Sequence, residues 1–592
     1  MALPPLNEAT IRNNATTQSF ERGVTYANGG AVVALTQRGK QLQAEVEGSE
    51  ASPYYVTIQF DDGGVTEARC SCPYDYAGWC KHIVATVLMG VRHPSRVEVR
   101  PTLEQLLDRL DWKQTQGLVK DLVLGQPELI EAIDRYVSLL TVPINPQESA
   151  QTPRATAIDP APFRRQVKQL IRDNINRVEE GWDDDLPFVG QLSEVVEKAD
   201  AFTERGNGQG AIAILEAITA ACADDWDDLS DYGAESDELM RLLNDSWTAA
   251  VLSAELSDEQ KVNLAVMLEE WQEALGGSFE MTMAAMKQGW DYPPLQLVLS
   301  GQVTEQGAWA REAPDFADAL ALVRLEILDR QGRDREYLYL AEAEGQILQY
   351  LMKLVELDEI ETLVATAKNA ITEATEAFIL AKALRERNHL GEALEIAQIG
   401  LNFSGYVKYE LATWTSDLAE GLGHSQVALE VKIIAFKERP SFQDYRRIEA
   451  LAGRAWTRIK QDLLHTLRTY AQWGADEAQV DIFLYEGLVD DAIDAVRSSS
   501  SYRSELVMRV MESAILHRPD WVIEKARQLA EPIMDGGKAD RYDQAVRWLR
   551  QVRAAYLQLG QIQEWSKYRA ELVMKHGAKR KLMGLFGQGG ME

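Results

Sequence analysis

The 592-residue sequence is poor in cysteine, in long apolar runs and in positive charge. Its four cysteines are too few for a disulfide-stapled scaffold. No apolar run approaches the roughly 18 residues that a membrane helix needs, and the best candidate, residues 83–91, spans nine. The amino terminus has no basic segment followed by an apolar one, so we expect no secretory signal. Together these absences predict a soluble, cytoplasmic protein in a reducing setting, without a membrane partner.

Positive charge is scarce, with 61 Lys and Arg against 92 Asp and Glu and a formal net charge of -31. Such acidity argues against a nucleic-acid-binding surface along the whole chain, since phosphates are neutralised by Lys and Arg. The charge is uneven, because residues 1–100 carry -1, residues 179–238 carry -16 and residues 546–592 carry +6. The acidity therefore leaves open what the first hundred residues bind.

Each of the two charged segments has two interpretations. Residues 179–238 are either solvated loops between helices or a docking site for a basic partner. Their acidic clusters lack the Asp-x-Asp-x-Asp-Gly pattern of a calcium loop. The basic residues 546–592 are either an ordinary last helix with a capping tail, or an electrostatic contact with the acidic segment of another copy or with nucleic acid.

Three of the four cysteines lie close to one histidine. Cys70, Cys72, Cys80 and His82 follow the order Cys-x-Cys, seven residues, Cys-x-His. Three thiolates and one imidazole hold structural zinc tetrahedrally, and four protein ligands leave no open position for catalysis. The alternatives are a redox pair, whose usual Cys-x-x-Cys is absent, and a chance cluster of small buried residues. The sequence therefore predicts one structural Zn²⁺ per chain.

The flanking residues predict a scaffold for these ligands. Residues 54–60 are β-branched and aromatic, residues 61–64 signal a turn, and residues 65–70 return as a second strand. Pro73 should end that strand, and Gly78 should permit a tight return. Residues 83–91 place apolar side chains on one helix face, so Cys80 and His82 lie at the helix amino terminus. Backbone N–H groups there lower the pKa of a thiol, as metal ligation requires.

The motif resembles the SWIM zinc finger, whose signature is Cys-x-Cys, a variable spacer and Cys-x-His. Upstream, Phe20, Gly23 and Tyr26 belong to a segment similar to the one that precedes the finger in bacterial SWIM-family proteins. The resemblance covers about residues 15–95. It implies a zinc-stabilised fold used for nucleic-acid or protein binding.

Relatives often join this finger to chromatin-remodelling-type ATPases or to mutator-type transposases. The sequence has no Gly-x-x-x-x-Gly-Lys-[Ser/Thr] phosphate loop and no His-Glu-x-x-His. We therefore expect a protein that is not an enzyme. Arg92, Arg96 and Arg100, just after the finger, are candidate nucleic-acid contacts, although they are too few for strong nonspecific DNA binding at physiological salt.

The pattern of the rest of the chain predicts helices. Residues 103–111 and 126–140 predict two amphipathic helices, and five prolines follow within residues 141–162. From residue 163 onward, short breaks recur near a 34-residue period, typical of tetratricopeptide hairpins. These breaks contain Gly206, Asp358, Asn388, Gly423, Gly487 and Gly560, and several precede an alanine that opens the next helix.

The predicted fold is therefore mainly α. A small α+β zinc-binding domain (1–95) precedes a helical hairpin (96–140), a proline-rich linker (141–162) and a long α-solenoid of degenerate tetratricopeptide-like hairpins (163–592). The alternative for the last region is an irregular helical domain. The predicted function is an interaction protein whose solenoid binds protein partners. The alternative is a nucleic-acid-binding protein that uses the finger and the adjacent basic cluster.

Overall fold

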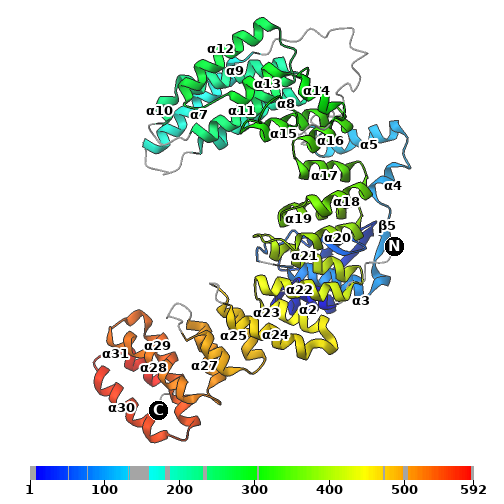
Figure 1. Ribbon diagram of the computed structural model, residues 1–592. Helices are drawn as coiled ribbons and strands as arrows, with labels where there is room; N and C mark the ends of the chain where they lie inside the picture. The colour runs from blue at the N-terminus through cyan, green and yellow to red at the C-terminus, as the bar shows by residue number, and fades with distance from the viewer. Residues whose placement is uncertain are drawn as a thin grey trace. The chain divides into compact units, whose positions relative to one another are not determined.

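The computed structural model describes residues 8–50, 52–76, 78–127, 129–130, 133, 159–179, 187–230, 236–302, 306–470, 474–497 and 504–588. The chain is mainly α-helical with a small amino-terminal sheet, as the sequence predicts (Figure 1). It forms two compact units, residues 1–102 with 372–592, and residues 103–371. Of the predicted linker, residues 141–162, the structure describes residues 159–162, and residues 141–158 lie outside the described residues. No helix of the described ranges is long and apolar enough to cross a membrane.

The amino-terminal residues form a five-stranded sheet whose strand order is β4-β3-β2-β1-β5. Neighbouring strands from β1 to β4 are antiparallel, and β5 pairs parallel to β1. The elements are α1 (Glu8–Asn13), α2 (Thr17–Asn28), β1 (Val32–Arg38), β2 (Gln41–Val46), β3 (Tyr54–Asp61), β4 (Gly64–Cys70), α3 (Lys81–Arg92), η1 (Pro94–Arg96) and β5 (Glu98–Arg100). The predicted hairpin is present as β3 and β4. Strand β2 was not predicted, although Leu42, Ala44 and Val46 alternate with polar residues, which is the signature of a strand with one buried face.

Helix α3 is more deeply buried than a helix with one apolar face. Every residue from His82 to Gly90 is buried, because α3 contacts both α2 and the strands of the sheet. The contact between the two helices requires a glycine, since a Cβ on Gly23 would lie 2.6 Å from Cβ of Val84. The prediction of a single apolar face was therefore too narrow.

Exchanging Gly23 for alanine should destabilise the packing of α2 on α3. The added methyl meets the Val84 side chain and lies 3.0 Å from the Lys81 carbonyl oxygen, and overpacking of this kind costs about 1–3 kcal/mol. Amide hydrogen exchange in α3 should report the lower local stability. In the matched change Gly190→Ala, nothing lies within 4 Å of the new Cβ, and alanine should stabilise α8 by up to about 1 kcal/mol. Equal protection of α3 in wild type and Gly23→Ala would contradict the close packing.

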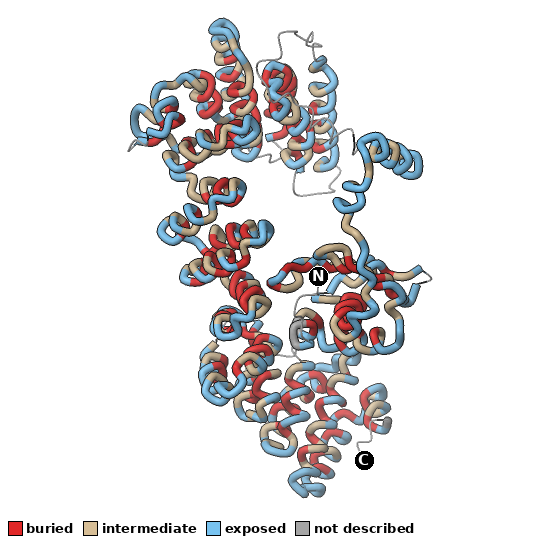
Figure 2. The backbone as a smooth tube through the Cα atoms, turned by 90° about the vertical axis from the view of Figure 1, so that its right-hand side faces the viewer, coloured by how far each residue is buried: buried red, intermediate tan, exposed pale blue. Residues whose placement is uncertain are grey.

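Residues 103–371 form the second unit, which is all helical in its described part. Its helices are α4 (Leu103–Leu107), α5 (Trp112–Gly125), α7 (Ala161–Glu179), α8 (Phe188–Glu204), α9 (Gly208–Asp224), α10 (Trp226–Ser230), α11 (Ser236–Leu252), α12 (Asp258–Leu275), α13 (Glu280–Gln288), α14 (Pro293–Leu299), α15 (Ala317–Arg330), α16 (Asp334–Ala343), α17 (Ile347–Glu356) and α18 (Ile360–Ala370). Most of them contribute residues to buried hydrophobic clusters, and Figure 2 colours the buried residues of the backbone red.

Helices α4 and α5 differ from the predicted pair. The first predicted helix, residues 103–111, ends at Leu107, and α5 occupies residues 112–125, for which no helix was predicted. The sequence carried a signal for α5, since Asp111 and Gln114 form a reciprocal capping box at its start. Most of the second predicted helix, residues 126–140, lies outside the described residues.

The acidic segment, residues 179–238, is described in part. Asp224 at the end of α9 pairs with Arg164 at 2.7 Å and with Lys168 at 2.9 Å, both on α7. Asp225 lies 3.7 Å from the same lysine. These carboxylates pair with cations of a neighbouring helix, and most of the described segment lies in α8 and α9 rather than in the solvated loops of the first interpretation. The cluster at residues 182–185 lies outside the described residues.

Residues 372–592 form the regular part of the helical array. Its elements are α19 (Ala374–Glu386), α20 (Leu390–Gly400), α21 (Lys408–Gly421), α22 (Ser425–Glu438), α23 (Phe442–Ala452), η2 (Gly453–Ala455), α24 (Trp456–Thr469), α25 (Asp476–Tyr485), α26 (Val489–Ala495), α27 (Ser504–Ala514), α28 (Pro519–Asp535), η4 (Ala539–Arg541), α29 (Tyr542–Gln558), α30 (Ile562–His576) and α31 (Arg580–Gln588). Helices α19, α21, α23 and α25 begin 34 residues apart. The predicted repeat period is therefore present.

The predicted breaks share one backbone conformation. Gly206, Asp358, Asn388, Gly423, Gly487 and Gly560 all have φ between 61° and 80°. In all six turns, the residue after the left-handed one donates its N–H to a carbonyl five residues earlier, as His389 does to Leu384, His424 to Ala419 and Leu488 to Phe483. This bond closes a Schellman motif, which ends one helix and starts the next. The alanines that follow, Ala211, Ala393, Ala428 and Ala492, are fully buried, as close helix packing requires.

The basic carboxyl-terminal residues cap the array. Lys575 pairs with Asp535 at 2.7 Å, and Lys581 donates to the Ala539 carbonyl at 2.7 Å. Leu582 and Phe586 of α31 are buried in the same core. These contacts favour the interpretation as an ordinary last helix.

Candidate metal centre

The four predicted ligands come together where β4 ends and α3 begins. Cys70 is the last residue of β4, Cys80 is the N-cap of α3, and His82 lies in the first turn of that helix. Their donor atoms, with that of Cys72, all lie within 4.8 Å of one another. A Cys₃His metal-binding group is therefore present at the position that the sequence predicts.

The spacing of the donors fits a tetrahedral zinc ion. The Sγ atoms of Cys70 and Cys80 lie 3.7 and 4.0 Å from Nδ1 of His82. Zinc bonded to sulfur at about 2.3 Å and to nitrogen at about 2.0 Å places such donors roughly 3.5–3.8 Å apart. The Nδ1 atom of His82 is therefore the donor that faces the cysteines.

Aromatic rings hold His82 in place. The Tyr54 ring stacks on the imidazole at 4.5 Å, and the Tyr26 ring meets its edge at 5.5 Å. Nε2 is buried without a hydrogen-bond partner in the described part of the chain, and a Cβ on Gly48 would lie 3.3 Å from it. Packing, rather than a second hydrogen bond, therefore orients this ring. Tyr26 belongs to the upstream segment that resembles SWIM proteins, and the structure gives it this contact.

Local hydrogen bonds favour a thiolate at Cys80. A hydrogen bond with Cys70 is the main cause that lowers the pKa of Cys80 to about 4, against the opposing effect of burial. Hydrogen bonds with His82 and with the backbone N–H of Ile83 lower it further, as expected at a helix amino terminus. The pKa of Cys70 is raised, chiefly by its hydrogen bond with Cys80 and then by burial. Cys222, in contrast, is fully buried in α9, and burial raises its pKa to about 12.

The loop between the two ligand pairs contacts the turn between α1 and α2. The backbone N–H of Trp79 donates to the Asn14 carbonyl at 2.5 Å. Gly78 has φ +84°, and a Cβ there would lie 2.8 Å from the same carbonyl oxygen. The predicted tight return at Gly78 is therefore present. The strand ends at Cys70, before Pro73, although Ser71 makes one more backbone hydrogen bond to Tyr55.

The candidate nucleic-acid contacts are largely paired within the domain. Arg92 pairs with Glu8 at 2.6 Å, and Arg100 pairs with Glu98 at 2.8 Å. Arg96 is exposed in η1. Because paired arginines are already neutralised, they contribute little to the counterion release that drives phosphate binding. Of the three arginines in the predicted basic cluster, Arg96 is therefore the one that forms no ion pair with a described residue.

The tip of the β3–β4 hairpin contacts the helical array of the same unit. Asp61 accepts two hydrogen bonds from Arg385 of α19, at 2.7 and 3.0 Å, and both side chains are 10% exposed. A Cβ on Gly63 would lie 2.6 Å from Cδ1 of Leu418, and Gly421 of α21 meets the Gly63 backbone. Lys40 donates to Asn388 at 2.8 Å. The sequence predicted the Asp-Asp-Gly-Gly turn but not this contact, which joins residues more than 300 positions apart.

Comparison with known proteins supports this description of the finger. Residues 54–90 match the family model of the SWIM zinc finger. Proteins called "Zinc finger SWIM domain-containing protein 8" from Bos taurus, Mus musculus and Homo sapiens are each 30% identical to this chain over 165 residues, 26% of its length. The match covers 12% of the cattle protein and 9% of the mouse and human proteins, so this chain corresponds to about a tenth of each relative.

Proposed function

We propose that the chain, which carries a SWIM zinc finger at residues 54–90, is a non-enzymatic interaction protein. In this proposal the finger binds one structural Zn²⁺ through Cys70, Cys72, Cys80 and His82. The repeats of residues 372–592 bind protein partners. The finger supplies a fixed module beside the repeats, and the repeats supply the binding surface.

The geometry of the finger supports a structural role for zinc. Cys70 ends a strand, whereas Cys80 and His82 begin a helix. When bound, zinc would cross-link the hairpin to the helix. The chain's own residues complete the site, because Tyr54 and Tyr26 orient the imidazole, and the N–H of Ile83 stabilises the Cys80 thiolate. Four protein donors leave no open coordination position, which supports a structural assignment over a catalytic one.

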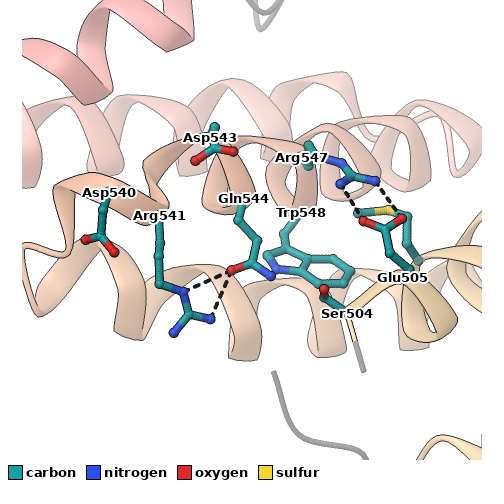
Figure 3. A pocket seen from close by; sticks show the side chains of 9 residues that line it. Ser504, Glu505, Asp540, Arg541, Asp543, Gln544, Arg547 and Trp548 are labelled. Carbon is teal, nitrogen blue, oxygen red and sulfur yellow. Dashed lines mark hydrogen bonds and ion pairs between the residues drawn. The ribbon is translucent and has the colours of Figure 1, made fainter. Parts of the chain in front are cut away.

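A pocket between successive repeats supports peptide binding by the array. The first helices of consecutive hairpins touch one another, as α23 with α25, α25 with α27 and α27 with α29. Between α27 and α29 lies a cavity of about 230 Å³, with Trp548 in its lining. Figure 3 shows Arg547 held by Glu505 through two hydrogen bonds, and Arg541 held by Gln544. Repeat arrays present such faces to extended peptides, and this pocket is the observation that carries the proposal.

Filling this pocket should abolish partner capture. Gln544→Arg adds a long cation where Gln544 receives the Arg541 hydrogen bonds. We expect partners captured by the full-length wild-type protein to survive nuclease treatment and to fall at least tenfold with Gln544→Arg. The matched change Gln528→Arg, at an exposed site on α28 outside the pocket, should retain them. Partners that vanish on nuclease treatment, or that both variants retain equally, would count against binding by the array.

A further inference from the structure

A second cavity lies directly beside the metal-binding group. It measures about 510 Å³ and is lined by Cys72, Cys80 and His82 together with residues of α2 and of the loop after β4. This volume falls in the range of sites that bind small molecules or short peptide segments, about 300–1,000 Å³. The cavity therefore has room for a ligand beside the metal-binding group.

Two cations line this cavity, and neither has a carboxylate partner among the residues that the structure describes. Arg22 on α2 and Lys81 on α3 both contribute to the lining. Lys81 lies 4.6 Å above the Tyr26 ring, a cation–π contact that orients the ammonium group without supplying a negative charge. Thr16 and Gln18 place the amino-terminal turn of α2 at the same cavity, and its N–H groups and dipole also favour an anion. The lining of this cavity therefore favours the binding of an anionic group.

Two tyrosine rings lie next to these cations in the lining of the cavity. Tyr74 and Tyr76 line the cavity with ring centroids 5.5 Å apart. Tyr74 is anchored by a hydrogen bond from Ser19 at 3.2 Å, whereas Tyr76 is 75% exposed. A ring this exposed does little to stabilise the fold, but it offers an apolar face to a ligand.

The amount of positive charge favours a carboxylate over a nucleic acid. One Zn²⁺ with three thiolates carries one net negative charge, so Arg22 and Lys81 leave about one positive charge for a ligand. Arg69, Arg92 and Arg100 of the same domain are already paired with carboxylates. Nonspecific nucleic-acid binding needs several phosphate contacts to reach useful affinity at physiological salt. A ligand with one carboxylate next to an apolar side chain, in contrast, can place the carboxylate at the two cations and the apolar group on the two tyrosine rings.

We propose that this cavity binds a peptide segment of a partner protein that carries a carboxylate next to an aromatic or large apolar side chain. The carboxylate lies between Arg22, Lys81 and the start of α2, and the apolar side chain packs on Tyr74 and Tyr76. This goes beyond the peptide pocket of the repeats, since it places a second peptide site on the finger itself.

Affinity selection from a random hexapeptide library tests this site. The full-length, zinc-loaded protein is presented with two libraries, one with free carboxyl termini and one amidated, and retained peptides are sequenced by mass spectrometry. We expect enrichment of a carboxylate beside Phe, Tyr or Leu, with retention at least tenfold lower on Arg22→Glu. Loss of enrichment on amidation assigns the carboxylate to the peptide terminus. Persistence with Asp or Glu assigns it to a side chain.

The control is Arg96→Glu, which makes the same charge change at an exposed site of the same domain and should leave retention unchanged. Zinc content, measured for each variant, shows that the finger is intact. Retention that is equal on wild type and Arg22→Glu would overturn the proposal. So would a labelled single-stranded RNA that binds and loses affinity in Arg22→Glu while no acidic peptide is enriched. The Gln544→Arg experiment stays independent of either result, because that residue lies in the pocket between α27 and α29.

Discussion

Replacing Cys72 with serine is expected to abolish zinc binding and to unfold the finger locally. Structural zinc sites contribute apparent binding free energies of about 10–16 kcal/mol, and a hydroxyl replaces one of three thiolates poorly as a zinc ligand. The loop from Cys70 to Cys80 has few other contacts to hold it, since its described backbone–backbone hydrogen bonds run from Ser71 to Tyr55 and from Trp79 to Asn14. Metal analysis should fall from one zinc per chain to near zero. Amide exchange should quicken in β4 and in the first turn of α3.

Cys222→Ser is the matched control for this change. Cys222 is buried in α9 and does not belong to the metal-binding group, so the variant should keep its zinc. Treatment of wild type with a strong chelator should reproduce the exchange pattern of Cys72→Ser. If Cys72→Ser retains the wild-type zinc content, the ligand assignment is wrong.

Exchanging Arg385 for leucine should release the finger from the repeats. Asp61 and Arg385 are each 10% exposed, and breaking a buried ion pair by removing one partner costs about 3–5 kcal/mol, because the other charge stays buried. We expect faster amide exchange in the β3–β4 turn and in α21, where Leu418 and Gly421 meet Gly63. Zinc content should not change, since the metal-binding group is at the other end of the hairpin.

A double-mutant cycle separates this ion pair from general damage. Asp61→Ala combined with Arg385→Leu removes both charges, so its cost should be smaller than the sum of the two single changes. Arg497→Leu breaks an exposed pair, with Arg497 and Asp494 76% and 62% exposed, and should cost under about 1 kcal/mol. Additive effects of Asp61→Ala and Arg385→Leu would show that the two residues do not stabilise each other.

Those parts of the finger that depend on neighbouring residues in the sequence could be predicted. The spacing of Cys70, Cys72, Cys80 and His82, the strand pattern before them and the apolar run after them lie within 40 residues. Strand β5 was not predictable in the same way, because Glu98–Arg100 has no buried side chain and pairs with β1 about 60 residues earlier. Register between distant strands depends on the folded sheet rather than on the pattern of one segment.

Asn388, within the repeats, likewise has one feature that the local sequence predicts and one contact that it does not. Its position before Leu390 and Ala393 identified a helix break, and its φ of +68° agrees with that role. Asparagine tolerates this conformation better than most residues, but glycine serves equally at Gly423. The side chain of Asn388 has a second contact, since it accepts a hydrogen bond from Lys40 in the turn between β1 and β2. A repeat pattern explains the turn, whereas only the packed structure explains this contact.

Zinc K-edge X-ray absorption of the purified protein shows directly whether the four predicted ligands hold a zinc ion. The account predicts one zinc per chain with three sulfur neighbours near 2.3 Å and one nitrogen near 2.0 Å, supplied by Cys70, Cys72, Cys80 and Nδ1 of His82. A spectrum dominated by oxygen or nitrogen neighbours, or a protein that binds no zinc when reduced and supplied with it, would contradict the account.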